Sequence, residues 1–306
     1  MPGTRQILLA ALTRRYPFYS GGIRFANHAL VRRLGGTSDE RVWARVKGGE
    51  VLAGLDDLVG RTAFYTGDLD RKISWVCARI ARPGDTVLDI GANIGIVTLW
   101  LSKLVGRTGR VYAFEPNPEL YEVIEQTIER NQALNIRAYP IALGAKTEQM
   151  ELRIRGGNTG SGSLVMNNDL AGCKVFPVWV RTLDGIVAEE RIEAIRLIKI
   201  DVEGFEAEVF RGALQVLKCI RPQAVLFEFI NKGRGRLSDQ AVFQTLQESG
   251  YGFFAIPKCR FRMYLERCDP EGVNDPAITD FLAVQRNDRF EEIARAVKAR
   301  TQRGSG

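Results

Sequence analysis

The sequence predicts an α/β protein built around a mostly parallel sheet with helices on both faces. From about residue 82 onward, short apolar runs alternate with helix-like segments, and this alternation is typical of such a sheet. The 306 residues are 45% hydrophobic and 26% charged, so the chain can bury a substantial core. A glycine-bearing turn follows the first apolar run of this part, where open parallel sheets bind their ligands.

The first half of the alternating pattern predicts three strands and two helices. We expect strands over residues 86–90, 110–115 and 136–143, and helices over residues 94–105 and 118–134. Pro118 lies in the first turn of the second helix, where its missing N–H costs nothing.

A long polar segment then interrupts the alternation. GGNTGSGSLVMNNDLAGCK, residues 156–174, lies between two expected strands over 150–154 and 175–180. A loop of this length inside a compact domain is more often functional or mobile than structural. We expect it to cover the substrate as a lid, with a disordered insertion as the alternative.

The alternation resumes after this segment. We expect strands over residues 195–202, 224–229, 251–256 and 280–285, and helices over residues 205–220, 238–249 and 290–300. Because no helical pattern separates the last two strands, they should form an antiparallel pair at the end of the sheet. Ser238 is the expected N-cap of its helix.

Charge is distributed unevenly along the chain. Residues 1–38 contain six arginines and no Asp or Glu, within a formal net charge of +7 for the whole chain. We therefore predict a basic, helical N-terminal extension over residues 1–80 and a ligand-binding domain over residues 81–287, with a β-insertion at about 148–181. A C-terminal helix and tail should follow over residues 288–306.

The N-terminal extension leaves two alternatives open. Its apolar run ILLAAL, residues 7–12, is too short to span a membrane and lacks a signal-peptide cleavage site. It could be a helical arm packed on the domain or a basic amphipathic segment resting on an anionic membrane. Breaks at Tyr16-Pro17 and Gly21-Gly22 prevent one long amphipathic helix, which favours the packed arm.

Cysteine and histidine usage excludes several function classes. The five cysteines are scattered without a CxxC pair, which disfavours a disulfide framework or a zinc site and favours a reducing, cytoplasmic compartment. The single histidine, His28, lies far upstream of every candidate motif, which disfavours a Ser-His-Asp relay. No aromatic-interleaved basic patch accompanies the positive charge, so we expect no nucleic-acid partner.

The turn in VLDIGANIG, residues 87–95, has an unusual glycine spacing. Asn93 stands where the middle glycine of a dinucleotide-binding turn would be, between Gly91 and Gly95, and Asp89 precedes the turn. A pyrophosphate favours bare backbone amides and is repelled by carboxylates. The turn therefore suits an amine or another cation better than a pyrophosphate.

A second acidic residue extends this interpretation. Glu115 closes the strand after the turn, within FEPNP. A carboxylate at this place can accept two hydrogen bonds from a ribose diol. Together the two motifs predict a nucleoside with a positively charged tail, a description that S-adenosylmethionine fits.

Further carboxylates occur near IKIDVEGFE, residues 198–206. Side chains alternate along a strand, so Lys199, Asp201 and Glu203 should point the same way if the chain stays extended. Glu228 ends the next strand, and the carboxyl ends of neighbouring parallel strands meet over one crevice. Because buried acids cost free energy unless they are paired, a functional role is indicated.

The motifs GDTVLDIGANIG, FEPNP, VRTLDGI, IKIDVEGFEAEVFRGA and the Glu of LFEF occur in this order between about residues 84 and 229. In this combination the chain resembles the FkbM family of S-adenosylmethionine-dependent methyltransferases over about half its length. The resemblance implies a Rossmann-like class I methyltransferase fold, with a seven-stranded, mostly parallel sheet whose last strand is antiparallel. One departure is that Asp68 and Asp70 occupy a segment where the family often has a Glu.

The resemblance also implies a set of cofactor contacts. Asp89, Gly91, Asn93 and Gly95 would line the methionine end, Glu115 the ribose, and Ala142 with Leu143 the adenine, with Pro116 and Asp201 completing the set. Family members mostly methylate hydroxyls of sugars and secondary metabolites, so the expected partner is a small hydroxyl-bearing acceptor.

An aliphatic hydroxyl must lose its proton during methyl transfer, and a carboxylate is the remaining candidate base in this crevice. We expect Asp201 or Glu203 to act as the base, with Glu228 as an orienting group or alternative base. A divalent cation held by the same acids is a further alternative, although no metal-ligand motif supports it.

Two other functions stay open. A nicotinamide-dependent oxidoreductase should show tighter glycine spacing and a catalytic Tyr-Lys, Ser or His group, and the sequence has neither. A non-catalytic or membrane-associated nucleoside-binding protein would use residues 1–38 as a weak membrane contact.

Overall fold

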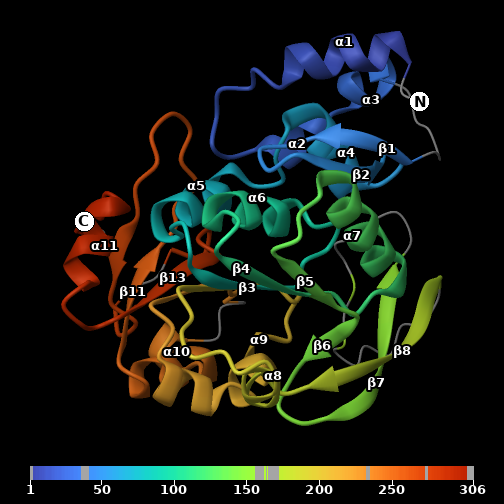
Figure 1. Cartoon of the computed structure of the whole chain (residues 1–306). Coiled ribbons are helices and arrows are strands. Elements are labelled where there is room, and N and C mark those ends of the chain that lie inside the picture. Colours follow the sequence, from blue (N-terminus) through green and yellow to red (C-terminus); the bar gives the residue numbers. More distant parts are fainter. Residues whose placement is uncertain are drawn as a thin grey trace.

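The computed structural model describes residues 3–35, 41–155, 162, 164, 172–231, 235–272 and 275–301. Its centre is an eight-stranded sheet in the order β12-β11-β13-β10-β9-β3-β4-β5, with helices on both faces (Figure 1). The strands are β3 (Thr86–Ile90), β4 (Arg110–Phe114), β5 (Ile136–Tyr139), β9 (Leu197–Ile200), β10 (Ala224–Glu228), β11 (Tyr251–Ala255), β12 (Glu266–Cys268) and β13 (Asp280–Gln285).

Strand directions confirm the predicted fold class. The five strands from β5 to β10 run parallel. The last strand, β13, lies between β10 and β11 and is antiparallel to both, as expected for the pair at the end of the sheet. β12 adds a short eighth strand at the edge of the predicted seven, and its three residues are too few to give a sequence signal.

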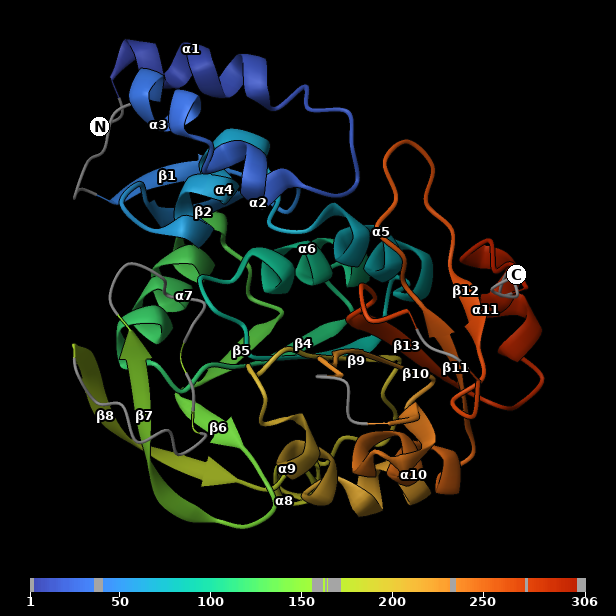
Figure 2. The same cartoon turned by 180° about the vertical axis from the view of Figure 1, so that it is seen from behind.

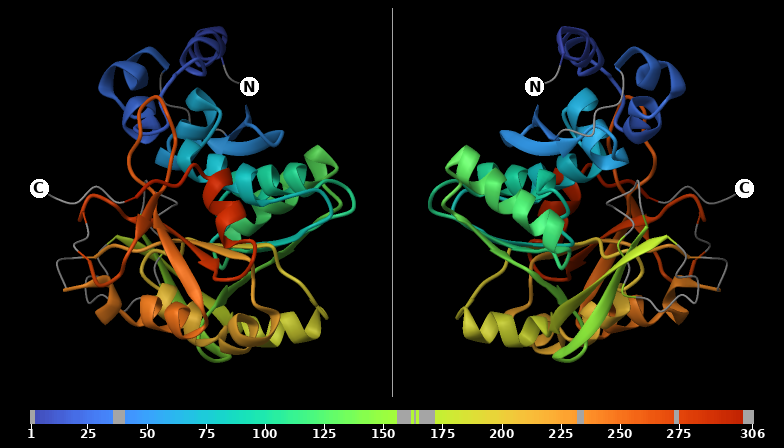
Figure 3. Two further views of the ribbon diagram at one scale, coloured as in Figure 1. Left: turned by 90° about the vertical axis from the view of Figure 1, so that its left-hand side faces the viewer. Right: turned by 90° about the vertical axis from the view of Figure 1, so that its right-hand side faces the viewer.

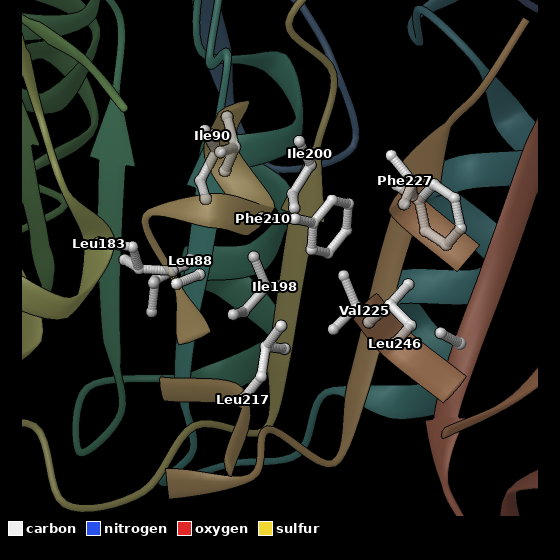
Figure 4. Packing of buried hydrophobic residues seen from close by; sticks show 14 of the residues in the cluster. Leu88, Ile90, Leu183, Ile198, Ile200, Phe210, Leu217, Val225, Phe227 and Leu246 are labelled. Atoms are coloured by element: carbon white, nitrogen blue, oxygen red, sulfur yellow. The ribbon is translucent and has the colours of Figure 1, made fainter. Parts of the chain in front are cut away.

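Helices cover both faces of the sheet (Figures 1 and 2). One face carries α5 (Arg71–Ile80), α6 (Ile96–Val105), α7 (Pro118–Asn131) and α11 (Phe290–Ala296), and the other carries α8 (Leu183–Glu189), α9 (Glu206–Arg211) and α10 (Ala241–Glu248). Side chains of each buried strand alternate between these faces, so Leu88 and Ile90 contact one helical layer while Val87 contacts the other. Figure 4 shows the layer that Leu88 and Ile90 contact, where Ile198, Val225 and their neighbours pack against Phe210 and Leu246.

Three predicted elements differ from the structure by more than a shift at their ends. The strand expected over 136–143 breaks at Pro140, because proline has no N–H with which to continue the ladder. After this break β6 (Ile141–Leu143) joins a separate three-stranded sheet with β8 (Cys173–Arg181) and β7 (Glu148–Arg155).

The other two predicted elements that differ are helices. The helix expected over 205–220 is interrupted after Arg211 and resumes as a π-helical segment, Val216–Ile220. At the interruption, a Cβ on Gly212 would lie 2.0 Å from the Gly144 carbonyl oxygen. The helix expected from Ser238 begins at Ala241 with Gln240 as its N-cap, because Ser238 belongs to a preceding 3₁₀ turn, so the prediction for Ser238 was wrong.

The N-terminal part packs on the sheet domain, as the first alternative expected. It consists of α1 (Thr4–Thr13), α2 (Gly22–Ala26), α3 (Ala29–Gly35), the hairpin β1 (Arg41–Arg45) and β2 (Glu50–Gly54), and α4 (Leu58–Thr66). Val51 and Ala63 share one apolar cluster with Leu99 of α6 and Leu120 of α7. The boundary near residue 80 stays a prediction, since this core crosses it.

Two side views show where the N-terminal elements lie relative to the sheet (Figure 3). α1 is at one end of the molecule, and α10 is on the opposite side of the sheet (Figure 3). Within the described ranges, no helix has the length and apolar character needed to cross a membrane.

Candidate functional site

A cavity of about 370 Å³ opens at the carboxyl ends of the central parallel strands. Nine of the predicted site residues line it: Gly91, Asn93, Glu115, Pro116, Ala142, Leu143, Asp201, Glu203 and Glu228. Asp89 and Gly95 are not part of this wall. The sheet thus brings together motifs that are more than 100 residues apart in the sequence, at the place where such sheets bind ligands.

The turn after β3 is held close to the end of β9. Gly91 has a φ of +79°, and a Cβ at this position would lie 1.9 Å from the carbonyl oxygen of Asp201. The backbone N–H groups of Gly91 and Ala92 both donate to the Phe114 carbonyl at 3.0 Å. Gly91 is therefore required both for its left-handed conformation and for this close approach.

Asp89 lies beneath the turn and is fully buried. Its carboxylate accepts a hydrogen bond of 2.6 Å from Thr98 Oγ1 and lies 3.2 Å from Lys199 Nζ. Lys199 Nζ also donates to the Gly91 carbonyl at 2.8 Å. The negative charge of Asp89 is thus offset by a protein ammonium, and the carboxylate supports the turn from below instead of facing the cavity.

Lys199 is the centre of this buried network. Burial lowers the pKa of the ammonium, but the carboxylates of Asp89 and Asp201 together raise it above its ordinary value. Lys199 was expected to point the same way as Asp201, and the two side chains do lie 3.7 Å apart at their charged atoms. Because Lys199 stays protonated, two acids can sit near one turn without strong repulsion.

Glu115 connects two loops of the cavity wall. Its Oε2 accepts the backbone N–H of Asn93 at 2.7 Å, and its Oε1 accepts that of Asn117 at 2.9 Å. Burial raises the pKa of this carboxyl to about 7, although the two amides act in the opposite direction. Each carboxylate oxygen can accept a further hydrogen bond, so the ribose contact stays compatible with this geometry.

All three candidate bases line the cavity, and burial raises the pKa of two of them. The side chain of Asp201 is 43% exposed. Burial raises the pKa of Glu203 to about 7, and Asp201 and Glu206 add to this shift. Burial likewise raises the pKa of Glu228 to about 8, with Asp201, Asp280 and Glu203 contributing. Glu203 and Glu228 can therefore exchange protons near neutral pH.

The conformation of Glu203 was not foreseen. β9 ends at Ile200, and Glu203 adopts a left-handed backbone with a φ of +52°, so strand alternation does not place its side chain. Asn93, in the turn after β3, has the same φ of +52°. Positive φ values at residues other than glycine cost free energy and cluster at functional sites.

Three charged residues of the site were missed or left in doubt. Asp280 lies opposite Glu228 in the β10–β13 register, and Asp70 caps α5; both line the cavity. Lys72 Nζ connects them, at 2.7 Å from Asp280 and 3.3 Å from Asp70. The sequence signal for Asp280 was its place at the start of the last strand, beside the end of a strand already bearing Glu228.

Apolar residues complete the wall. Ile23, Leu58, Leu69 and Ile73 come from the N-terminal part and α5. From the segment 156–174, the described residues Gly162 and Leu164 also line the cavity, whereas most of the expected lid lies outside the described residues. Among the described residues, no group of three or more His, Cys, Asp or Glu side chains is arranged to hold a metal ion.

The strand order, the antiparallel β13 and the cavity at the carboxyl ends of the strands define a Rossmann-like protein of the class I methyltransferase type. Residues 89–253 match a family described as the Methyltransferase FkbM domain. Because this match covers more than half of the sequence, the chain belongs to the FkbM methyltransferase family.

Several characterised proteins are similar to this chain. The 31-O-demethyl-FK506 methyltransferase FkbM of Streptomyces tacrolimicus is 31% identical over an alignment of 158 residues, and the match covers 43% of this chain and 60% of that protein. Methyltransferase sdnD of Sordaria araneosa is 25% identical over 154 residues, covering 41% of this chain and 59% of the relative. The hexuronic acid methyltransferase AglP of Haloferax volcanii is 22% identical over 142 residues, covering 46% and 54%. The chain thus spans about three fifths or less of these relatives.

A crystal structure of methyltransferase FkbM from Methylobacillus flagellatus also aligns with this fold. It covers 67% of this chain and 48% of its own, with a TM-score of 0.43 and 17% identity.

Proposed function

We propose that this chain is an S-adenosylmethionine-dependent methyltransferase that methylates a hydroxyl group of a sugar or of a secondary-metabolite-type small molecule. The observation that carries the proposal is the position of Glu115 in the cavity wall, where it binds the turn after β3 through Asn93 and shares the cavity with Glu203 and Glu228. This arrangement offers a ribose acceptor, a close backbone approach and titratable acids within one site. Family membership supports the reaction class.

The residues present fit the cofactor. Ala142 and Leu143 are buried apolar residues at the end of β6, suited to an adenine face. Gly91 and Asn93 both line the cavity, so the methionine end can approach the backbone of this turn. Asp201, which stays partly exposed at the cavity, supplies the negative charge that the Asp89 position was expected to give.

When bound, S-adenosylmethionine supplies an electrophilic methyl group on a sulfonium. The chain's own contribution is to hold the acceptor hydroxyl in line with that methyl group, which accounts for much of the rate in well-oriented systems. Glu203 or Glu228 can accept the hydroxyl proton, because their raised pKa values lie close to neutral pH. Lys72 pairs with Asp280 and Asp70, so it limits the negative charge at this end of the cavity.

The names of two relatives support a hydroxyl-bearing small molecule as the acceptor. One is a demethyl-FK506 methyltransferase that acts at an oxygen, and the other is a hexuronic acid methyltransferase. The cavity wall combines acids that can bind hydroxyls with apolar residues such as Leu58 and Ile73. A polyol or sugar with an apolar portion would match both kinds of surface.

Calorimetric titration with S-adenosylmethionine and with NADH tests the proposal. We expect the parent chain to bind S-adenosylmethionine and not NADH, and Glu115→Ala to bind at least about tenfold more weakly, because a ribose acceptor and a loop contact are both lost. Glu129→Ala, on the exposed side of α7, is the matched control and should bind like the parent.

Tight NADH binding would support an oxidoreductase instead. Unchanged S-adenosylmethionine binding in Glu115→Ala would remove the observation on which the proposal depends. Cofactor binding without turnover on a panel of sugar and polyol acceptors would favour the non-catalytic alternative.

A further inference from the structure

The outer face of the first and third helices is apolar and open. Six of the twelve exposed large apolar side chains in the described part of the chain fall within residues 7–34. Five of them lie on α1 and α3 and are each more than half exposed: Ile7, Leu8, Leu12, Leu30 and Leu34, which we call the α1/α3 face. A group of exposed large apolar side chains on two contacting helices is typical of an interaction site.

α1 is anchored by its other side. Ala10 and Thr13 are buried, and Thr13 Oγ1 donates to the Tyr65 carbonyl at 2.7 Å, which fixes the helix to α4. A surface helix with one buried stripe normally carries polar residues opposite that stripe. α1 instead exposes Ile7, Leu8 and Leu12 there, so it is apolar on both sides.

α3 lies beside α1 and also exposes leucines, here next to its buried residues. Leu30 and Leu34 are four residues apart and therefore lie on one side of the helix, while Val31 and Gly35 are buried. Figures 1 and 2 show α1 and α3 together at one end of the molecule, away from the helices that cover the far side of the sheet. The two helices thus offer their leucines from a single projecting part of the chain.

Exposed positive charge accompanies this face in the same part of the chain. Five exposed arginines belong to the same segment: Arg5, Arg15, Arg24, Arg32 and Arg33. No ion pair of these five is present among the described residues, and residues 3–35 contain no Asp or Glu. The partner of this face should therefore be apolar at its centre and negatively charged at its surface.

We propose that the α1/α3 face docks on an anionic lipid surface. The leucines and Ile7 enter the boundary between headgroups and acyl chains, and the exposed arginines contact the phosphates. A second copy of this chain would cover the apolar side chains but would bring the same arginines into opposition. The docking is peripheral and independent of the methyl-transfer proposal.

Vesicle co-sedimentation of the full chain tests the docking. We expect vesicles of phosphatidylcholine with phosphatidylserine to bind the parent at least about tenfold more tightly than phosphatidylcholine alone, and added salt to weaken that binding. Leu8→Gln with Leu12→Gln should weaken binding about tenfold or more, because two apolar side chains are no longer there to be buried in the membrane. Arg32→Gln with Arg33→Gln should remove most of the preference for phosphatidylserine.

Matched controls lie elsewhere on the surface. Leu134→Gln changes a leucine after α7 that is more exposed still, and Arg107→Gln with Arg110→Gln removes two exposed arginines near β4; both variants should bind like the parent. S-adenosylmethionine titration and thermal unfolding of every variant show whether the fold is kept. The single variant Leu8→Gln replaces the double variant if that one fails to fold.

The proposal is overturned if the parent does not prefer phosphatidylserine vesicles, or if the face variants bind like the controls. It is also overturned if the parent ignores vesicles but self-associates in sedimentation velocity through the same residues, which would make the face a contact between copies. Because cofactor binding is measured on the same samples, a failure of docking is distinguishable from a failure of the methyltransferase proposal.

Discussion

At the scale of single residues, the site depends on how buried charges are paired. Lys199 lies between Asp89 and Asp201 and also holds the Gly91 carbonyl. The sequence placed Asp89 and Lys199 in two motifs 110 residues apart, and nothing in either motif shows that the two side chains meet. Only the β3–β9 pairing, with Asp89 opposite Lys199 in register, makes them partners.

Replacing Lys199 should therefore destabilise the chain strongly. Lys199→Met leaves the fully buried Asp89 with Thr98 as its remaining partner, and we expect a loss of about 3–5 kcal/mol in the free energy of unfolding. Urea unfolding measures this loss. The double variant with Asp89→Asn should recover part of it, since no fully buried charge is then left unpaired, whereas Lys218→Met on the surface should change little. A loss below about 1 kcal/mol for Lys199→Met would show that Asp89 needs no ammonium.

Glu228 should make stability depend on pH. Its pKa rises from an ordinary 4.5 to about 8 on folding, so the folded chain binds the proton more tightly than the unfolded chain. Stability should then fall as pH rises between these two values, because the carboxyl must ionise in a buried place.

Glu228→Gln removes this penalty, and we expect about 1–2 kcal/mol of added stability near pH 8 and little change near pH 5, after allowing for partial solvent screening. Thermal unfolding across this range measures both values, with Glu129→Gln as the surface control. Equal pH slopes for Glu228→Gln and the parent would contradict the burial of this carboxyl. If Glu228 is the base, turnover should also fall while S-adenosylmethionine binding is kept.

At the scale of elements, the sequence predicted strands best where turn residues flank them. The bounds of β3 and β13 agree with the prediction, since each is followed by a turn or a polar segment. The hairpin of β1 and β2 was missed, although Lys47-Gly48-Gly49 between two strand-like runs is a hairpin signal.

Contacts between elements were harder to predict than the elements themselves. In the cluster of Asp70, Lys72, Asp280 and Glu228, Lys72 binds Asp280 from 208 positions away, so only the folded sheet brings the cluster together. By contrast, Glu115 and the Gly91 turn were placed correctly in one site, because both lie at the carboxyl ends of neighbouring strands.

The turn after β3 is the element most sensitive to substitution. Gly91→Ala places a Cβ 1.9 Å from the Asp201 carbonyl oxygen, so the turn must move away from β9. We expect a clear loss of thermal stability and of S-adenosylmethionine binding. Gly106→Ala is the matched control, because Gly106 also has a positive φ, +65°, but has nothing within 4 Å of its Cβ position.

That control isolates backbone strain, which costs about 1–3 kcal/mol by itself. If Gly91→Ala behaves like Gly106→Ala in both measurements, strain alone accounts for the effect and the close approach to Asp201 is not required.

At the scale of the whole molecule, the N-terminal part and the sheet domain share both a core and a cavity. The apolar cluster that contains Val51 and Ala63 extends into α6 and α7, and Ile23 and Leu58 form part of the cavity wall. The sequence did not predict this shared core and cavity. In the sequence, residues 1–38 stand out by their charge. The extension is thus a structural part of the site as well as the carrier of the α1/α3 face.

One polar side chain connects the two parts where β2 meets α7. Asn131 Oδ1 accepts the backbone N–H of Glu50 at 2.9 Å, and its Nδ2 donates to the Glu50 carbonyl at 2.6 Å. Asn131→Ala would leave both backbone groups of Glu50 without these partners, at a cost of about 1–3 kcal/mol. Because the hairpin lies at the edge of the shared core, we expect it to open locally before the rest of the chain unfolds.

Hydrogen exchange measures this opening. In Asn131→Ala, amides of β1 and β2 should exchange faster while those of β3 and β4 stay protected. Asn135→Ala is the control, since Asn135 makes similar bonds to Ser102 and Gly106 but wholly within the sheet domain. It should speed exchange near α6 and leave the hairpin unchanged. If the hairpin stays equally protected in both variants, the apolar cluster alone must hold the two parts together, and the Asn131 contact contributes only to alignment.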